Sequence, residues 1–129
     1  MVNSKVVQKA LKQTLAMEND PGLKTNKPAD DQSSIISRLI YDTFGGEILK
    51  THKKKGWHFY NRIDGKRVDF TLFKKVKSSK IIHFEDFLST PDETYNYFAQ
   101  EDYATFFMRF IRAFEEVIGL KKYRIDHAA

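Results

Sequence analysis

Residues 56–71 read Gly56-Trp57-His58-Phe59-Tyr60-Asn61-Arg62-Ile63-Asp64-Gly65-Lys66-Arg67-Val68-Asp69-Phe70-Thr71. At the centre of this stretch, Asp64-Gly65 separates two runs that are rich in aromatic and β-branched residues. A type I′ turn needs positive φ at both central residues, and an Asp-Gly pair tolerates that conformation. The stretch therefore predicts a β-hairpin closed by a two-residue turn.

The turn also predicts which residues share a face of the hairpin, because side chains alternate along a strand. We expect one face to be core, carrying Trp57, Phe59, Val68 and Phe70. The other face carries His58, Tyr60, Arg62, Arg67, Asp69 and Thr71.

On this second face His58 and Asp69 are diagonal neighbours, with Cα atoms roughly 7–8 Å apart. A carboxylate that binds an imidazole fixes the tautomer and orientation of the ring. Such a pair makes up two of the three members of a nucleophilic triad. A lone His beside an Asp can equally be structural. A three-residue loop would shift the pairing by one residue and send the two side chains to opposite faces.

The length and composition predict one folded domain, spanning residues 1–129. The chain has 41% hydrophobic and 14% aromatic residues, enough to build a core without metals or disulfides. It has no cysteine, which excludes disulfides, Fe–S clusters and thiolate zinc sites. The sequence has no apolar run near 18 residues and no signal-peptide pattern, so we expect a cytoplasmic protein without a membrane segment.

No cofactor or metal site is predicted, since His52, His83 and His127 have no spacing that assembles metal ligands. The oligomeric state does not follow from the sequence.

The charge is concentrated in the middle of the chain. Residues 50–80 contain eleven Lys/Arg and two Asp/Glu, a balance of 11 − 2 = +9, against +5 for the whole protein. Such a segment suits an anionic partner, and nucleic acid could contact Lys53, Lys54 and Lys55 while Trp57 or Tyr60 stacks on bases. A solvated Lys-rich surface is the simpler alternative, and we favour it.

Hydrophobic periodicity predicts three helices, over residues 4–17, from Gln32 or Ser33 to Phe44, and over residues 101–120. Residues 18–31 are expected to form a loop, residues 47–51 and 81–84 strands, residues 52–55 a basic connector, and residues 72–76 a helical turn. Thr90-Pro91-Asp92-Glu93 is a typical helix start. The predicted fold is α+β: a small antiparallel sheet with an N-terminal helix, a middle helix, and a long C-terminal helix covering its apolar face.

A third triad member would have to come from another element, and a helix N-terminus is the favoured source. There the helix dipole and free amides stabilise an anionic nucleophile. Ser33 occupies that place at the start of the middle helix. The alternative interpretation is that Ser33 or Ser34 simply caps the helix.

Five segments of the chain form one recognisable set: Gln32-Ser33, residues 42–48 (Asp-Thr-Phe-Gly-Gly-Glu-Ile), residues 56–62, Asp64-Gly65, and residues 68–71. Together they resemble the YunG-like family of small bacterial proteins. The family pattern has Gly-Gln-Cys before the helix, then Gly-Gly-Glu-Ile, His-Tyr or His-Phe followed by Asn, and Asp-Leu-Thr or Asp-Phe-Thr. The resemblance spans roughly residues 31–71 and aligns the family Cys with Ser33.

The family arrangement is similar to that of papain-like and transglutaminase-like cysteine hydrolases, so the resemblance implies a papain-like core acting on a peptide or amide. It implies Ser33 as the nucleophile position, His58 as general base and Asp69 as the group that orients it. Gln32 is implied as an oxyanion donor. Tyr60 and Asn61 would lie close by, although the predicted register points Asn61 to the opposite face.

This chain departs from the family pattern at Asp31, which replaces the Gly, and at Ser33, which replaces the Cys. A site shaped for a thiolate loses most activity with a hydroxyl. The chain is then an inactivated Cys-to-Ser variant, a natural pseudoenzyme, or a serine hydrolase, and we favour the first two. The alternatives outside hydrolysis are a basic nucleic-acid-binding module and a protein-interaction or structural domain without catalysis.

Overall fold

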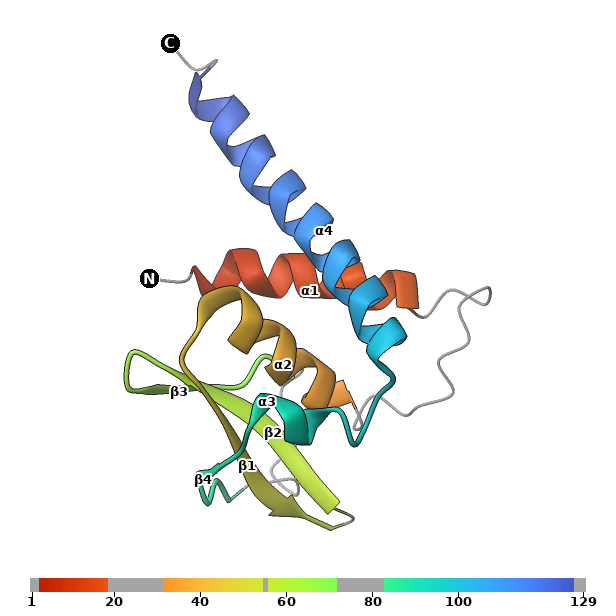
Figure 1. The fold of residues 1–129 in the computed structure, drawn as a ribbon. Coiled ribbons are helices and arrows are strands. Elements are labelled where there is room, and N and C mark those ends of the chain that lie inside the picture. The colour runs from red at the N-terminus through yellow and green to blue at the C-terminus, as the bar shows by residue number, and fades with distance from the viewer. Residues whose placement is uncertain (1–2, 19–31, 55, 72–82, 127–129) are drawn as a thin grey trace. The chain divides into compact units, whose positions relative to one another are not determined.

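The computed structural model describes residues 3–18, 32–54, 56–71 and 83–126, with side chains described up to residue 119 (Figure 1). It divides into two compact units, one formed by residues 27–100 and the other by residues 1–26 with 101–129. The predicted single domain stays a prediction. The predicted loop after Glu18 and the predicted helical turn at residues 72–76 lie outside the described residues.

The unit of residues 27–100 is built on a four-stranded antiparallel sheet with strand order β3-β2-β1-β4. Its strands are β1 (Glu47–Lys53), β2 (Gly56–Ile63), β3 (Lys66–Val68) and β4 (Phe87–Leu88). Helices α2 (Ser33–Phe44) and α3 (Pro91–Thr94) belong to the same unit. Together with the helices of the other unit, this sheet confirms the predicted α+β class.

The predicted hairpin is confirmed, and so is its register. Asp64 and Gly65 have φ of 51° and 75°, as a type I′ turn requires. The pairs are Ile63 with Lys66, Arg62 with Arg67, and Asn61 with Val68. The ladder ends at Val68, so Asp69 follows directly after the last paired residue.

Two predicted segments differ in the structure. His52 and Lys53, predicted as part of a connector, extend β1 by pairing with Trp57 and Gly56. In the predicted strand at residues 81–84, residues 81 and 82 lie outside the described part and residues 83 and 84 form no strand. The Thr51 hydroxyl donates to the carbonyl of His83, and the edge strand forms later, at Phe87–Leu88.

Both faces of β2 are buried, whereas the sequence predicts one core face. Phe59 and Phe70 are buried as predicted, but His58 and Tyr60 on the other face are also only 8% and 1% exposed. Residues 84–86 cover Tyr60 on that face: the centroids of the Phe84 and Tyr60 rings are 4.7 Å apart, and Asp86 binds the Tyr60 hydroxyl. This cover comes from a segment distant in sequence.

Helix α2 packs against β2, and its apolar residues Ile36, Leu39 and Ile40 are all buried. The helix ends before Gly45, and Gly46 then brings the chain against the backbone of β2. Helix α3 starts as predicted: Thr90 is its N-cap and accepts a hydrogen bond from the Glu93 amide. Arg38 Nη1 donates to the Pro91 carbonyl and ties α3 to α2.

The second unit contains α1 (Ser4–Glu18) and α4 (Gln100–Asp126), which cross in Figure 1. Asn3 caps α1 by accepting from the amides of Lys5 and Val6. Each helix has a buried apolar stripe. In α1 it comprises Val7, Ala10 and Leu11, and in α4 it comprises Tyr103, Phe106, Phe110 and Ala113. Both predicted helices are confirmed, α4 with six more residues at its C-terminal end. The predicted placement of α4 over the sheet stays a prediction.

In the described part of the chain, no helix combines the length and apolarity that crossing a bilayer requires.

Candidate functional site

His58 and Asp69 form a direct, largely buried pair. His58 Nε2 lies 2.6 Å from Asp69 Oδ2, and the two side chains are 10% and 6% exposed. The pair joins β2 to the residue that follows β3, as the predicted register requires. A carboxylate oxygen without a proton only accepts hydrogen bonds, so the 2.6 Å contact assigns the imidazole proton to Nε2 and places the acceptor lone pair of the ring on Nδ1.

The Asp69 carboxylate has a second set of contacts through its other oxygen. Oδ1 accepts from the Thr71 amide at 3.0 Å and from the Thr71 hydroxyl at 2.6 Å. The amide contact closes an Asx-type turn directly after β3. Both oxygens are therefore bound, one to the imidazole and the other to Thr71.

Ser33 does not act as a side-chain cap of α2. Gln32 is the N-cap residue, with no side-chain cap hydrogen bond, and Ser33 is the first residue of the helix. The Ser33 hydroxyl, buried in the structure, accepts from the Phe59 amide at 3.1 Å. The start of α2 is thus attached to the residue that follows His58.

A second contact one helical turn further along fixes α2 on the strand. Asn61 Nδ2 donates to the Ser37 carbonyl at 2.9 Å, and Asn61 is fully buried. Ser33 and Ser37 lie four residues apart, on the same helix face. Asn61 thus holds α2 and, as predicted, points to the face of β2 opposite His58.

The sequence-predicted site residues are brought together to different degrees. His58 and Asp69 are bonded, and Tyr60 stacks beside His58 with ring centroids 6.0 Å apart. Ser33 reaches the backbone of the residue next to His58, with half-buried Gln32 beside it in sequence. Within the described residues, no hydrogen bond joins the Ser33 hydroxyl to the imidazole.

Sequence reasoning missed Asp86, which organises the neighbouring polar network. Asp86 Oδ1 accepts from the Tyr60 hydroxyl at 2.8 Å and from Arg67 Nε at 2.9 Å, and the Asp86 amide donates back to the Tyr60 oxygen. The Arg67 hydrogen bond holds the pKa of Asp86 below its ordinary value. Asp86 has φ of 58°, unusual for a residue other than glycine, and no pattern in the sequence marks it.

The same network raises the pKa of Tyr60 to about 12, through burial and the hydrogen bond to Asp86. The unfolded chain loses this proton near its ordinary value of 10.0. Folded protein therefore binds more protons between these pKa values, and stability should fall as pH rises from 10 to 12. Spectrophotometric titration of the six tyrosines should show one ionising late, and Tyr60→Phe should remove that late step. An alkaline titration curve that Tyr60→Phe leaves unchanged would contradict this assignment.

A metal site is not evident around these residues: across the described ranges no group of three His, Asp or Glu side chains is placed to hold an ion.

Comparison with known proteins extends the resemblance beyond the hairpin. A family model described as "YunG protein" matches residues 3–115, most of the chain. The chain belongs to the YunG family. It is 32% identical over 99 residues to a Bacillus subtilis (strain 168) protein, a match that covers 70% of this chain and 84% of that one. That relative is named "Uncharacterized protein YunG". No solved structure matches the chain.

YunG membership covers both compact units, because the matched range includes α1, the sheet and part of α4. The predicted family is therefore confirmed. The papain-like arrangement and the alignment of Ser33 with a family Cys stay predictions.

Proposed function

We propose that this YunG-family chain is a hydrolase-like domain of the cysteine peptidase or amidase type, whose nucleophile position is Ser33. As it stands, with serine there, we propose an inactivated variant or a pseudoenzyme. The observation that carries the proposal is the buried His58–Asp69 pair, directly followed along the strand by the amide that binds Ser33.

The chemistry would follow from what surrounds position 33. A thiol there would lie at the N-terminus of α2, where the helix dipole favours an anion, and against the Phe59 N–H, which can donate to a thiolate. His58 Nδ1 would take the thiol proton, which requires the imidazole to reach position 33 from the opposite face of β2, because Asn61 attaches α2 to the other face of that strand. Asp69 would stabilise the resulting imidazolium through Nε2.

The thiolate would attack the carbonyl carbon of a peptide or amide and form an acyl-enzyme, with Gln32 as an oxyanion donor. The imidazolium would return its proton to the leaving amine, and water would then release the acid.

Serine fits this scheme poorly, which favours an inactive site over a serine hydrolase. A hydroxyl ionises far less readily than a thiol, so it depends more strongly on a bonded base. The Ser33 hydroxyl instead accepts from a backbone amide, and across the described residues it makes no hydrogen bond to His58.

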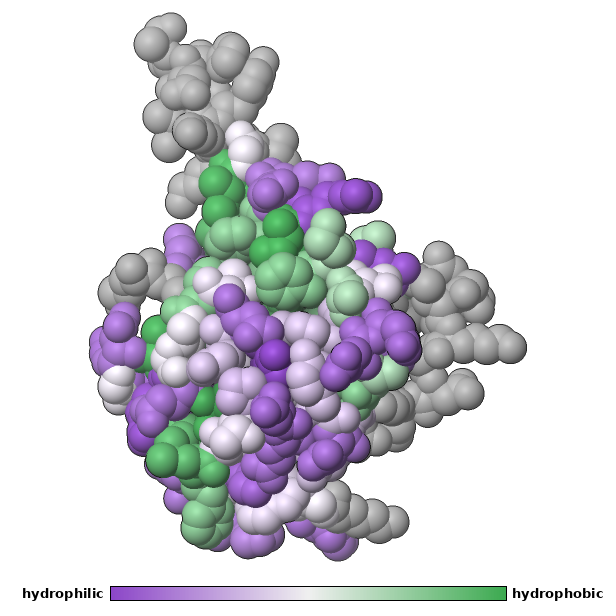
Figure 2. All heavy atoms as spheres, viewed as in Figure 1, coloured by the Kyte–Doolittle hydropathy of each residue, from purple (hydrophilic) through white to green (hydrophobic). Residues whose placement is uncertain are grey.

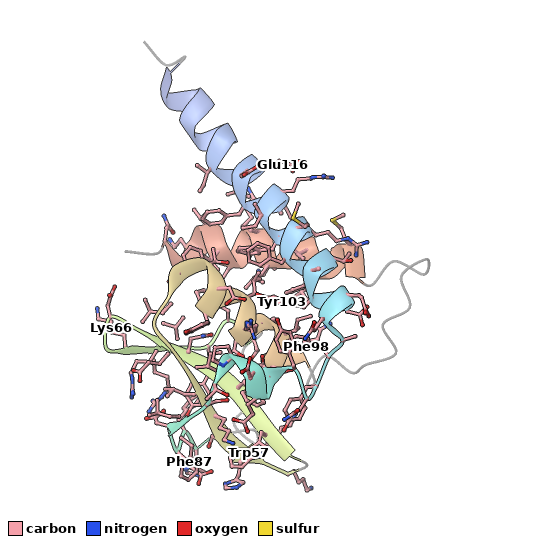
Figure 3. The ribbon with its side chains drawn as sticks, viewed as in Figure 1. Trp57, Lys66, Phe87, Phe98, Tyr103 and Glu116 are labelled. Atoms are coloured by element: carbon pink, nitrogen blue, oxygen red, sulfur yellow. The ribbon has the colours of Figure 1, made fainter. Side chains whose placement is uncertain are left out.

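The nucleic-acid alternative has less support than the hydrolase-like one. Three cations of the basic segment are neutralised within the protein: Lys50 by Glu93, Arg62 by Glu47 and Arg67 by Asp86. Trp57, the best stacking residue of this segment, already packs against two other rings (Figure 3). Its ring centroid lies 4.1 Å from that of His52 and 6.1 Å from that of Phe87. Figure 2 shows hydrophobic side chains at the lower end of the 27–100 unit, where Figure 3 places Trp57 and Phe87. The Phe87 residue there is 45% exposed.

Installing a thiol at position 33 tests the proposal directly. At a pH of about 6.5, lowering the pKa of a thiol from about 8.5 to about 6.5 raises its thiolate fraction roughly 50-fold. The less basic thiolate is also a weaker nucleophile, which lowers its intrinsic rate of attack by somewhat under tenfold. Ser33→Cys should therefore react with iodoacetamide up to about fivefold faster than Ser33→Cys/His58→Ala, a control that keeps the thiol, the helix N-terminus and the Phe59 N–H but lacks the imidazole. Equal rates in two folded variants would overturn the proposed function.

A further inference from the structure

Thr71 makes a contact that the turn after β3 does not require. An Asx-type turn needs the hydrogen bond from the Thr71 amide to Asp69 Oδ1, which is present at 3.0 Å. The Thr71 hydroxyl donates to the same oxygen at 2.6 Å. The hydroxyl bond adds nothing to the backbone turn, so its effect falls on the carboxylate.

The position of Asp69 explains why the carboxylate needs such a contact. The β2–β3 ladder ends at Val68, so strand pairing does not hold the Asp69 backbone. Two donors that reach Oδ1 from different atoms fix the plane of the carboxylate. Oδ2 is then left pointing at His58 Nε2, 2.6 Å away.

We propose that Thr71 is a positioning residue, whose hydroxyl orients the Asp69 carboxylate towards His58. The inference deepens the proposed function and rests on it only for the catalytic consequence. The orientation itself exists whatever stands at position 33.

The test uses the full chain and the His58 Nε2 proton, observed by NMR and assigned by its absence in His58→Gln. Thr71→Val keeps the backbone N–H and the side-chain shape but removes the hydroxyl. Losing one hydrogen bond to a charged group should speed exchange of the Nε2 proton with solvent roughly tenfold. Thr71→Ser restores the hydroxyl and should restore slow exchange, whereas Asp69→Ala should abolish protection.

A purely structural role for Thr71 predicts something different. Thr71→Val would then lower the melting temperature and leave the Nε2 proton as protected as in the original chain, which would overturn the inference. If Thr71→Val does not fold, Thr71→Ser decides: fast exchange in that folded variant would also overturn it.

The positioning role of Thr71 and the hydrolase-like function can be overturned independently of each other. Suppose that slow exchange of the Nε2 proton depends on the Thr71 hydroxyl, but that Ser33→Cys is alkylated at the same rate with and without His58→Ala. The positioning role of Thr71 would then stand, and the hydrolase-like function would be overturned. Adding Thr71→Val to Ser33→Cys should otherwise bring its alkylation rate towards that of Ser33→Cys/His58→Ala.

Discussion

Gly46→Ala is expected to lower the free energy of unfolding by about 2–5 kcal/mol. Gly46 has φ of 84°, which costs a residue with a side chain about 1–2 kcal/mol. A Cβ on Gly46 would also lie 2.3 Å from the carbonyl oxygen of Arg62, which belongs to the β2 backbone. Since a backbone atom cannot simply rotate away, we expect about 1–3 kcal/mol more from displacement of the strand or the turn.

Gly65→Ala is the matched control for this prediction. Gly65 also has a positive φ, 75°, but a Cβ there would meet no atom within 4 Å. It should cost only the conformational part, about 1–2 kcal/mol. Urea unfolding of the two variants measures the difference, and equal losses would show that the close approach of Gly46 to β2 does not constrain the fold.

The close approach matters for the candidate site because Gly46 lies between α2 and β1. It brings the end of α2 against β2, while Ser33 and Asn61 attach the helix start and middle to the same strand. The segment from α2 to β1 is thus attached to β2 at three points along its length.

The hairpin and the pairing of His58 with Asp69 could be predicted because they depend on local rules. Asp64-Gly65 selects a turn type, the turn length sets the register, and alternation assigns His58 and Asp69 to one face. The same alternation placed Asn61 on the opposite face, where it binds Ser37. None of these steps needs a distant part of the chain.

The cover over Tyr60 could not be predicted, because it depends on long-range contacts. The apolar run at residues 81–84 predicted a strand, but the edge strand forms at Phe87–Leu88 after the positive-φ residue Asp86. Asp86 binds Tyr60 and Arg67, 26 and 19 residues away. Sequence patterns describe the periodicity of one segment and carry no information on such partners.

The role of Ser33 could be predicted only in part. Its position at the start of α2 follows from the hydrophobic period and the preceding polar residues. Whether its hydroxyl caps the helix or contacts a strand depends on how α2 packs on β2. That packing is tertiary, and it sends the hydroxyl to the Phe59 amide.

The central claim is that the surroundings of position 33 stabilise an anionic nucleophile. The chain has no cysteine, so Ser33→Cys introduces a single thiol, and its thiolate can be titrated by ultraviolet absorbance. The helix N-terminus, the Phe59 N–H and His58 should lower the pKa of this thiol from about 8.5 to below about 7. Ser34→Cys, one residue along and also buried, provides the matched control.

We expect the thiol of Ser34→Cys to keep a higher pKa than that of Ser33→Cys, because position 34 shares the start of α2 but its buried side-chain oxygen has no hydrogen-bond donor among the described residues. A low pKa in Ser33→Cys alone is the result that the account predicts. A thiol at position 33 that titrates at or above its ordinary pKa, in a folded protein, would contradict it.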